Sequence, residues 1–378
     1  MNTFKPTILL FGFLLFAVAC QTNYPKDTVP QPGNQYSRSF RIEADSGGYT
    51  LHLFSPWMNE ESEHYTYFLK RNTKINKITN LANQTIAIPI QRVAVMSTTH
   101  LAFIEAIESS ESVVAVSDTR YVNSLKYLNR INQGEIANIG YETSLDFETL
   151  LSVRPDVCFM YGLSSSATQT AERLISLGIP VVFVSEFNEQ KPLGKLEWLR
   201  FIACFYDKFS FADSLFQFRV KSYENALKLT KGIELRPTVL VGLPWKDVWN
   251  VPGNYTVTAE FIRDAGGEYI FQSLNQKINY NLSIEEVYSV AANAQFWINI
   301  GIATAKSDIV STDYRLNLFR AYQDGRLFNN NKRINSFGGN DYMESGVLFP
   351  DSILLDLISI LHPEKLPNYQ TRYYQRLQ

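Results

Sequence analysis

The sequence predicts an α/β protein of two similar lobes with parallel sheets, joined by one long α-helix and preceded by a β-hairpin extension. A duplicated segment predicts the two lobes, because residues 145–162 and 282–301 align from their starts and place Glu148 opposite Glu285. Each copy reads as a short helix, a turn and a continuous apolar run, which is typical of a strand buried in a parallel sheet. Between the copies, residues 195–231 repeat apolar side chains at helical spacing.

Capping residues support these helices. Asp146 and Ser283 are N-cap types at the starts of the two copies, and Ser283 with Glu286 forms a capping-box pattern. Gly232 is a natural end for the bridging helix. A continuous helix over this segment would span about 55 Å at a rise of about 1.5 Å per residue, which suits a bridge between two lobes.

The composition indicates a globular protein without a strongly basic surface. The chain has 378 residues, 45% hydrophobic and 19% charged, which is enough for two cores. The net charge of −2 excludes a strong field for nucleic acid. No Gly-x-Ser-x-Gly elbow, phosphate loop or HExxH pair occurs, and the few histidines are scattered. We therefore predict no enzymatic activity, no cofactor and no protein-held metal.

The N-terminus reads as a targeting segment. Residues 1–19 form a signal peptide with Lys5 before an apolar run too short to span a bilayer. The run ends in Ala-Val-Ala-Cys at Cys20, which resembles a bacterial lipobox, although Ala17 stands where leucine is usual. Acylation of Cys20 would anchor the protein. An ordinary secretory signal cut near Ala19 is the alternative.

The remaining elements follow in chain order. Residues 20–37 are a Pro-containing tether, and 38–91 form a β extension whose hairpin turns at Asp45-Ser-Gly-Gly. The N-terminal lobe covers 92–194, the bridge 195–232 and the C-terminal lobe 233–378. Predicted strands are 65–69, 86–90, 93–96, 113–116, 180–184 and 238–241, and predicted helices are 101–107, 171–177, 259–264, 313–322 and 350–361. Cys158 and Cys204 read as buried small hydrophobes, with a disulfide between them less expected.

Several motifs in this order resemble one family over residues 92–363. They are Arg92-Val-Ala-Val-Met-Ser, the copy ending Leu-Ser-Val-Arg-Pro-Asp-Val, Leu177-Gly-Ile-Pro-Val-Val, Asp264-Ala-Gly-Gly and Ser283-Ile-Glu-Glu-Val. The chain resembles the substrate-binding proteins of ABC importers for iron complexes and cobalamin, which have a rigid helical backbone. The resemblance implies two Rossmann-like lobes facing a shallow cleft, and a monomer lipid-anchored in the periplasm that docks on an ABC permease dimer in the inner membrane. The β extension lies outside the family pattern.

Ligand contacts are expected beyond the carboxyl ends of the parallel strands. A loop with two tryptophans between proline and glycine is hard to bury and favours the cleft. The predicted ligand-binding residues are Thr99, His100, Tyr121, Tyr161, Trp245, Lys246, Trp249, Tyr255, Arg315 and Tyr342.

The ligand class stays open at the level of the sequence. An iron chelate such as a ferric siderophore fits first, then cobalamin, then haem; an adhesion or scaffold lipoprotein and a degenerate enzyme are the alternatives of other classes. Glu148 and Glu285 lie in the first turns of their helices, where the helix dipole alone favours a carboxylate. The resemblance implies a second role, because acidic residues at these positions of the cobalamin-binding relative meet arginines on the two permease subunits.

Overall fold

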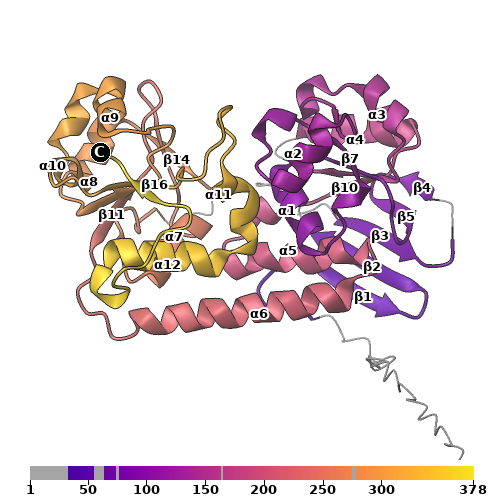
Figure 1. Cartoon of the computed structure of the whole chain (residues 1–378), viewed down its shortest axis with the longest axis horizontal. Coiled ribbons are helices and arrows are strands. Elements are labelled where there is room, and N and C mark those ends of the chain that lie inside the picture. Colours follow the sequence, from indigo (N-terminus) through magenta and orange to yellow (C-terminus); the bar gives the residue numbers. More distant parts are fainter. Residues whose placement is uncertain (1–32, 55–63, 74–75, 163–164, 275–277) are drawn as a thin grey trace, which may run out of the picture. The chain divides into compact units, whose positions relative to one another are not determined.

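The computed structural model of the protein describes residues 33–54, 64–73, 76–162, 165–274 and 278–378. The predicted signal peptide, Cys20 and most of the predicted tether lie outside these residues. The described chain contains an N-terminal mixed sheet, two lobes with mainly parallel sheets, and helices that pack across both lobes (Figure 1). The predicted α/β fold class is confirmed.

The N-terminal extension is a five-stranded sheet in the order β1-β2-β3-β5-β4, in which only β3 and β5 pair in parallel. Its strands are β1 (Phe40–Asp45), β2 (Gly48–Phe54), β3 (His64–Lys70), β4 (Lys77–Asn80) and β5 (Asn83–Ala87). Alternate residues are buried, as the period of a half-buried strand requires. The Tyr67 hydroxyl accepts a hydrogen bond from the Phe183 amide, and the Gln84 side chain pairs with the backbone of Val181. The predicted hairpin is therefore part of a sheet that covers the edge of the first lobe.

The first lobe contains a parallel sheet in the order β10-β9-β6-β7-β8. Its elements are β6 (Val93–Val95), α1 (Thr98–Ala106), β7 (Val113–Val116), α2 (Leu125–Asn132), β8 (Ala137–Asn138), α3 (Phe147–Val153), β9 (Val157–Met160), α4 (Ser165–Ser176) and β10 (Val181–Phe183). Every residue of β6, β7, β9 and β10 is buried, as their apolar runs predict.

The second lobe repeats the arrangement with a sheet in the order β13-β11-β15-β16-β17, in which only β17 is antiparallel. Its strands are β11 (Thr238–Val241), β13 (Glu268–Tyr269), β15 (Phe296–Ile298), β16 (Leu327–Asn329) and β17 (Gln375–Arg376), and β12 (Trp249–Val251) pairs with β14 (Tyr280–Leu282) in a separate ribbon. Its helices are α7 (Val257–Asp264), α8 (Ile284–Ala291), α9 (Lys306–Thr312), α10 (Arg320–Gln323), α11 (Asp341–Glu344) and α12 (Pro350–Leu361).

Both copies of the duplicated segment fold as predicted, with α3 leading to β9 and α8 leading to β15. The Asp146 carboxylate accepts the Thr149 amide at the start of α3. At the start of α8, Ser283 and Glu286 exchange hydrogen bonds in a complete capping box. The N-cap pattern in the sequence was sufficient to predict where α3 and α8 begin, because the cap residues bond to the first turn of their own helix.

The bridging helix is shorter than predicted. Residues 195–232 hold most of α5 (Pro192–Cys204) and the whole of α6 (Phe209–Leu227), separated by a turn in which Asp207 has a left-handed φ of 55°. The 19 residues of α6 span about 28 Å at about 1.5 Å per residue. Tertiary contacts hold the turn, because Arg71 binds Asp207 through two hydrogen bonds and the Lys208 ammonium donates to the carbonyls of Ile107 and Glu108 at the end of α1. The break corrects the expectation of one continuous helix over this segment.

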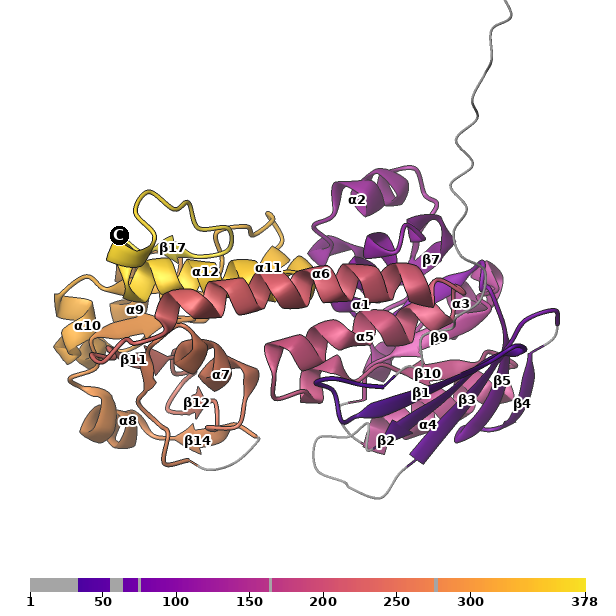
Figure 2. The same ribbon diagram turned by 90° about the horizontal axis from the view of Figure 1, so that it is seen from below.

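Helices α5 and α6 both contribute to the bridge between the lobes. Nearly all of α5 is buried, whereas α6 buries one stripe of residues. Helix α6 packs against α5 on one side and α12 on the other (Figure 2). A long helix therefore links the lobes, as predicted. Cys158 in β9 and Cys204 in α5 are buried free thiols, which confirms that they act as small apolar side chains.

The predicted tether is packed at its end. The backbone amides of Gln35, Tyr36 and Ser37 donate to the carboxylate of Glu197 on α5, at 2.8–2.9 Å. Burial of Glu197 is offset by these amides and by its ion pair with Arg200 at 2.7 Å. Residues 35–37, placed in the tether by the sequence, thus belong to the folded unit. Within the described part of the chain, none of the helices is both long and apolar enough to cross a bilayer.

Candidate functional site

The strand ends of the first lobe carry a linked polar and aromatic cluster. Asp118, just after β7, accepts the Arg120 guanidinium at 2.7 and 3.0 Å and the Tyr141 hydroxyl at 2.8 Å. These bonds, chiefly the one from Arg120, lower the pKa of Asp118 to about 2. The Arg120 guanidinium lies 5.7 Å from the centre of the Tyr121 ring, so Arg120 connects both tyrosines. Tyr121 and Tyr141 are each 39% exposed.

The loop after β16 in the second lobe contacts this cluster. The Asn335 amide nitrogen donates to the carbonyls of Arg120 at 2.9 Å and Val122 at 3.1 Å. A Cβ atom at Gly339 would lie 2.5 Å from the Tyr121 carbonyl oxygen, so this close approach requires glycine. The carboxyl edge of the first sheet and the loop after β16 therefore meet at Tyr121.

The second lobe presents a small hairpin at the end of β11. Trp245 and Val248 bond each other's backbone, and the turn between them holds Lys246 at a left-handed φ of 56°. This geometry turns the Trp245 side chain outward, where it is 71% exposed. Lys246 is exposed beside it, and Tyr255, after β12, is 47% exposed. An exposed tryptophan between an exposed lysine and a buried strand is suited to contact a solute.

Trp249 does not lie at the surface. Its side chain is 0% exposed, stacks on Trp297 at 5.4 Å and donates its indole N–H to the Val241 carbonyl at 3.0 Å. The sequence pattern indicated that the two tryptophans of this loop are hard to bury together, and it predicted that both contact the ligand. The prediction is wrong for Trp249, because β12 returns its indole to the core, whereas the tight hairpin exposes Trp245.

His100 is also a core residue. Its ring is 0% exposed, packs edge-on to Phe159 and lies 3.9 Å from the carboxylate of Glu186. Burial lowers the pKa of His100 to about 3, so the imidazole is neutral at ordinary pH. The expected ligand contact by His100 is corrected, because no part of its side chain reaches the surface. Its neighbour Thr99 donates its hydroxyl to Glu186 at 2.6 Å and remains partly exposed in the first turn of α1.

The other three predicted contacts lie in three different places. Tyr161 is half-buried at the end of β9, on the same sheet edge as Tyr121. Tyr342 lies on α11, where its ring packs edge-on to Tyr373 and Tyr374. Arg315 lies elsewhere, because its guanidinium binds Asp313 at 2.7 Å and also the Glu285 carboxylate on α8. The structure thus associates Arg315 with the predicted docking residue Glu285 instead of the strand ends.

Arg120 and Tyr141 were not among the residues predicted from the sequence. Tyr141 follows β8, which has only two residues and little apolar pattern. The sequence signal that could have identified it is Gly140, two positions after Asn138, since such a glycine marks a tight turn at a strand end. In the structure Gly140 has a left-handed φ of 76°. Within the described ranges, no three His, Cys, Asp or Glu side chains gather closely enough to hold a metal ion.

Glu344 of the second lobe caps a helix of the first. Its carboxylate accepts the backbone amides of Asn123 at 2.7 Å and Ser124 at 2.9 Å, directly before α2. Those amides have no partner within α2, so the carboxylate supplies the missing helix cap across the lobes. Burial raises the pKa of Glu344 to about 7, although the two amides favour its charged form.

We expect this carboxyl group to make stability depend on pH. Between a pH of about 4.5 and about 7, the folded protein holds a proton on Glu344 that the unfolded chain releases, so the free energy of unfolding rises as the pH falls through this window. The gain is at most about 3 kcal/mol. Between pH 8 and pH 5, the melting temperature of the wild type should therefore rise by several degrees relative to that of Glu344→Gln. Glu148→Gln, at an exposed site, is the control, and parallel profiles for wild type and Glu344→Gln would contradict the assignment.

Comparisons with known proteins agree with this architecture. Residues 93–333 match the family described as periplasmic binding protein. An uncharacterized lipoprotein of Methanocaldococcus jannaschii is 30% identical over 302 residues, which cover 76% of this chain and 69% of that protein. A second uncharacterized lipoprotein of the same organism is 26% identical over 250 residues, covering 64% of this chain and 61% of that protein.

Solved structures share the fold at low identity. A possible iron-binding, periplasmic solute-binding protein from Staphylococcus epidermidis is 15% identical, with a TM-score of 0.58 over 72% of this chain and 99% of that one. The periplasmic haem-binding protein HutB of Vibrio cholerae is 21% identical, with a TM-score of 0.56 over 72% of this chain and 99% of that one. Because the family match spans most of both lobes and the fold agrees, this chain belongs to the periplasmic binding protein family, whose members are solute-binding components of ABC transporters.

Proposed function

We propose that the chain captures a ferric siderophore between the carboxyl edges of its two sheets and delivers it, chemically unchanged, to an ABC permease dimer in the inner membrane. The observation that carries the proposal is the set of exposed aromatic side chains at strand ends of both lobes, Tyr121 and Tyr141 on the first and Trp245 on the second. Aromatic faces beside a few polar groups are a common design for binding an organic ligand.

The charges near these aromatic residues suit a chelate with modest negative charge. Arg120 is held by Asp118 through two hydrogen bonds, so this pair adds little net charge. Lys246 is exposed next to Trp245 and would provide the cation for an anionic chelate. Thr99, in the first turn of α1 after β6, and Tyr161, directly after β9, would add polar contacts.

Cobalamin and haem are the second candidates, because flat macrocycles also pack well on exposed tyrosine and tryptophan. The solved structures of this fold include a haem-binding protein and a vitamin B12-binding protein of Vibrio cholerae. A scaffold or adhesion role is disfavoured by membership in a family of solute-binding proteins.

The proposed setting is the periplasmic side of a bacterial cell envelope, with a monomer held to the membrane by an acylated Cys20. Both Methanocaldococcus jannaschii relatives named above are lipoproteins by name. We retain the division of the chain into an extension at 38–91, a first lobe at 92–194, a bridge at 195–232 and a second lobe at 233–378. The extension would then support the first lobe from its sheet edge, where Gln84 already pairs with β10.

Ligand binding should quench tryptophan fluorescence through Trp245. A ferric hydroxamate, a ferric catecholate, cyanocobalamin and haemin form the panel, and we expect a ferric chelate to bind most tightly. Trp245→Ala should weaken the affinity for that ligand by at least about 1 kcal/mol, or about fivefold, because exposed aromatic anchors commonly contribute this much.

Tyr314→Ala is the matched control, since Tyr314 is 76% exposed on the second lobe beside Arg315 and not at a strand end. It should leave the affinity unchanged. Equal losses of ligand affinity in the two variants would show that Trp245 is not part of the binding site. Absence of binding by every compound in the panel would overturn the proposed function.

A further inference from the structure

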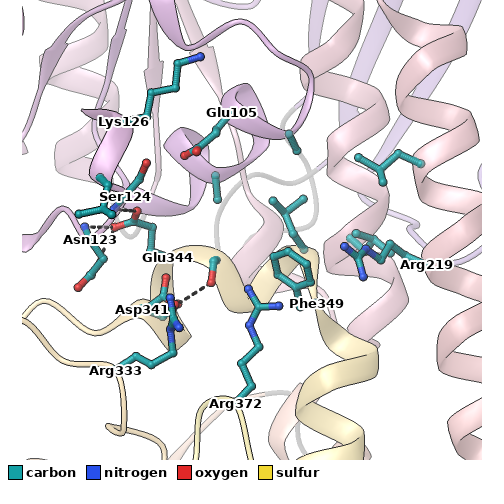
Figure 3. A pocket seen from close by; sticks show the side chains of 17 residues that line it. Glu105, Asn123, Ser124, Lys126, Arg219, Arg333, Asp341, Glu344, Phe349 and Arg372 are labelled. Carbon is teal, nitrogen blue, oxygen red and sulfur yellow. Dashed lines mark hydrogen bonds and ion pairs between the residues drawn. The ribbon is translucent and has the colours of Figure 1, made fainter. Parts of the chain in front are cut away.

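A cavity lies between the lobes and is lined by none of the strand-end residues described above. Its volume is about 480 Å³, within the usual range for small-molecule pockets. The first lobe supplies parts of α1 and α2, and the second lobe supplies α11 and residues near the start of α12, while α5 and α6 complete the wall (Figure 3). Glu344, bonded to Asn123 and Ser124, borders the cavity with them.

Two arginines stack on one phenyl ring in this cavity. The Arg372 guanidinium lies 3.6 Å from the centre of the Phe349 ring, and the Arg219 guanidinium lies 4.2 Å from it. Stacking fixes the plane of each guanidinium and leaves its N–H groups at the edge available for an acceptor. Figure 3 shows both arginines directed toward Phe349 from different elements.

The positive charges of Arg219 and Arg372 are only weakly neutralised by carboxylates. Among the described residues, the Arg372 guanidinium stacks on the rings of Phe349 and Tyr373 and forms no ion pair with a carboxylate within 4.0 Å. The nearest carboxylate oxygen of Asp351 lies 3.5 Å from the Arg219 guanidinium, which is long for a charged hydrogen bond.

The other charges that line the cavity are mostly engaged or directed elsewhere. Arg333 binds Asp341 at 2.5 Å, and Glu344 accepts two amides. Lys126 lies 3.7 Å from Glu111. Glu105 extends from α1 toward Ser124, away from Arg219 and Arg372 (Figure 3). The end of the cavity at Phe349 therefore carries an excess of positive charge.

We propose that this cavity binds an organic carboxylate with an apolar body. The carboxylate would lie against Arg219 and Arg372, since a planar guanidinium matches a carboxylate in a bidentate fork. The apolar body would pack on the apolar side chains of the wall, which are Ala102, Ala106, Leu196, Leu215 and Leu348. Such an occupant would touch both lobes at once. The proposal is independent of the solute bound at the strand ends.

Calorimetric titration with sodium octanoate tests the site in the full-length protein. Octanoate should bind with a measurable affinity, and octanamide, which has the same chain without the charge, should bind at least tenfold more weakly. Arg219→Gln and Arg372→Gln should each weaken octanoate binding by about tenfold. Arg173→Gln is the matched control, because Arg173 stacks on Phe147 at 3.9 Å outside the cavity, and it should leave binding unchanged.

Each result bears on the proposal. Equal binding of octanoate and octanamide, or no octanoate binding at millimolar concentrations, would overturn it on the unaltered protein, whatever the stability of the variants. Octanoate binding that persists in Arg219→Gln and Arg372→Gln would also overturn it. Retained affinity of these variants for the ferric hydroxamate or ferric catecholate of the panel above would show that they are folded and that the two sites are separate.

Discussion

Replacing Glu148 and Glu285 together with glutamine should abolish solute uptake and complex formation with the permease, while ligand affinity and melting temperature change little. Both side chains are exposed, one on α3 of the first lobe and one on α8 of the second. Two equivalent carboxylates on two lobes match a pair of related membrane subunits that present arginines. Glutamine keeps a hydrogen-bonding side chain and removes only the charge.

The matched control is the double variant Glu108→Gln with Glu234→Gln, which removes one exposed carboxylate from each lobe at other positions. It should transport normally. Normal uptake by the Glu148 and Glu285 double variant would contradict docking and leave only the interaction of these carboxylates with the helix dipole.

Arg315 provides an additional test of the docking surface. Its guanidinium binds Glu285 and Asp313, and the backbone amide of Glu285 followed by Arg315 lowers the pKa of the Glu285 carboxyl. Glu285 is therefore ionised but partly neutralised by its neighbour. Arg315→Gln should free both carboxylates and leave docking intact or stronger, most visibly at low salt. A loss of docking in Arg315→Gln would indicate that the permease recognises the arginine instead.

Changing Cys20 to alanine should move the protein from the membrane fraction to the soluble fraction. The reason is that acyl chains contribute about 0.8 kcal/mol per buried methylene, so two or three chains dominate membrane attachment. Fractionation together with metabolic labelling by a fatty acid checks the result. Cys158→Ala is the control, because that thiol is buried in β9 and should not affect attachment. Membrane association of Cys20→Ala equal to that of the wild type, without label on the wild type, would contradict acylation.

Structural elements that depend on short stretches of sequence were predicted correctly. The apolar runs of β9 and β15, the capping box of Ser283 and the hairpin of β1 and β2 depend on neighbours within a few residues or on burial in one sheet. The duplicated helix and strand then identified the fold class. Short or polar elements such as α2 and β8 escaped prediction, because two to eight residues give too little periodicity.

Only the tertiary structure determines which residues form the candidate site. Trp245 and Trp249 are four positions apart in the same loop, yet one is 71% exposed and the other 0% exposed, because a backbone turn and the pairing of β12 with β14 direct them oppositely. The break between α5 and α6 depends on contacts with distant segments, because Arg71 binds Asp207 and Lys208 in the turn donates to the Ile107 carbonyl. Phe349 likewise meets Arg219 and Arg372 only after folding.

The sequence alone was thus enough for the class of fold, the two lobes and the family, because backbone propensity and apolar periodicity are properties of a local segment. The structure alone decided which aromatic residues face solvent, where the bridge bends and which charges remain unpaired. These features depend on contacts between residues far apart in the chain. Glu344 capping α2 from the other lobe, across more than two hundred positions of sequence, is such a contact, and no local pattern encodes it.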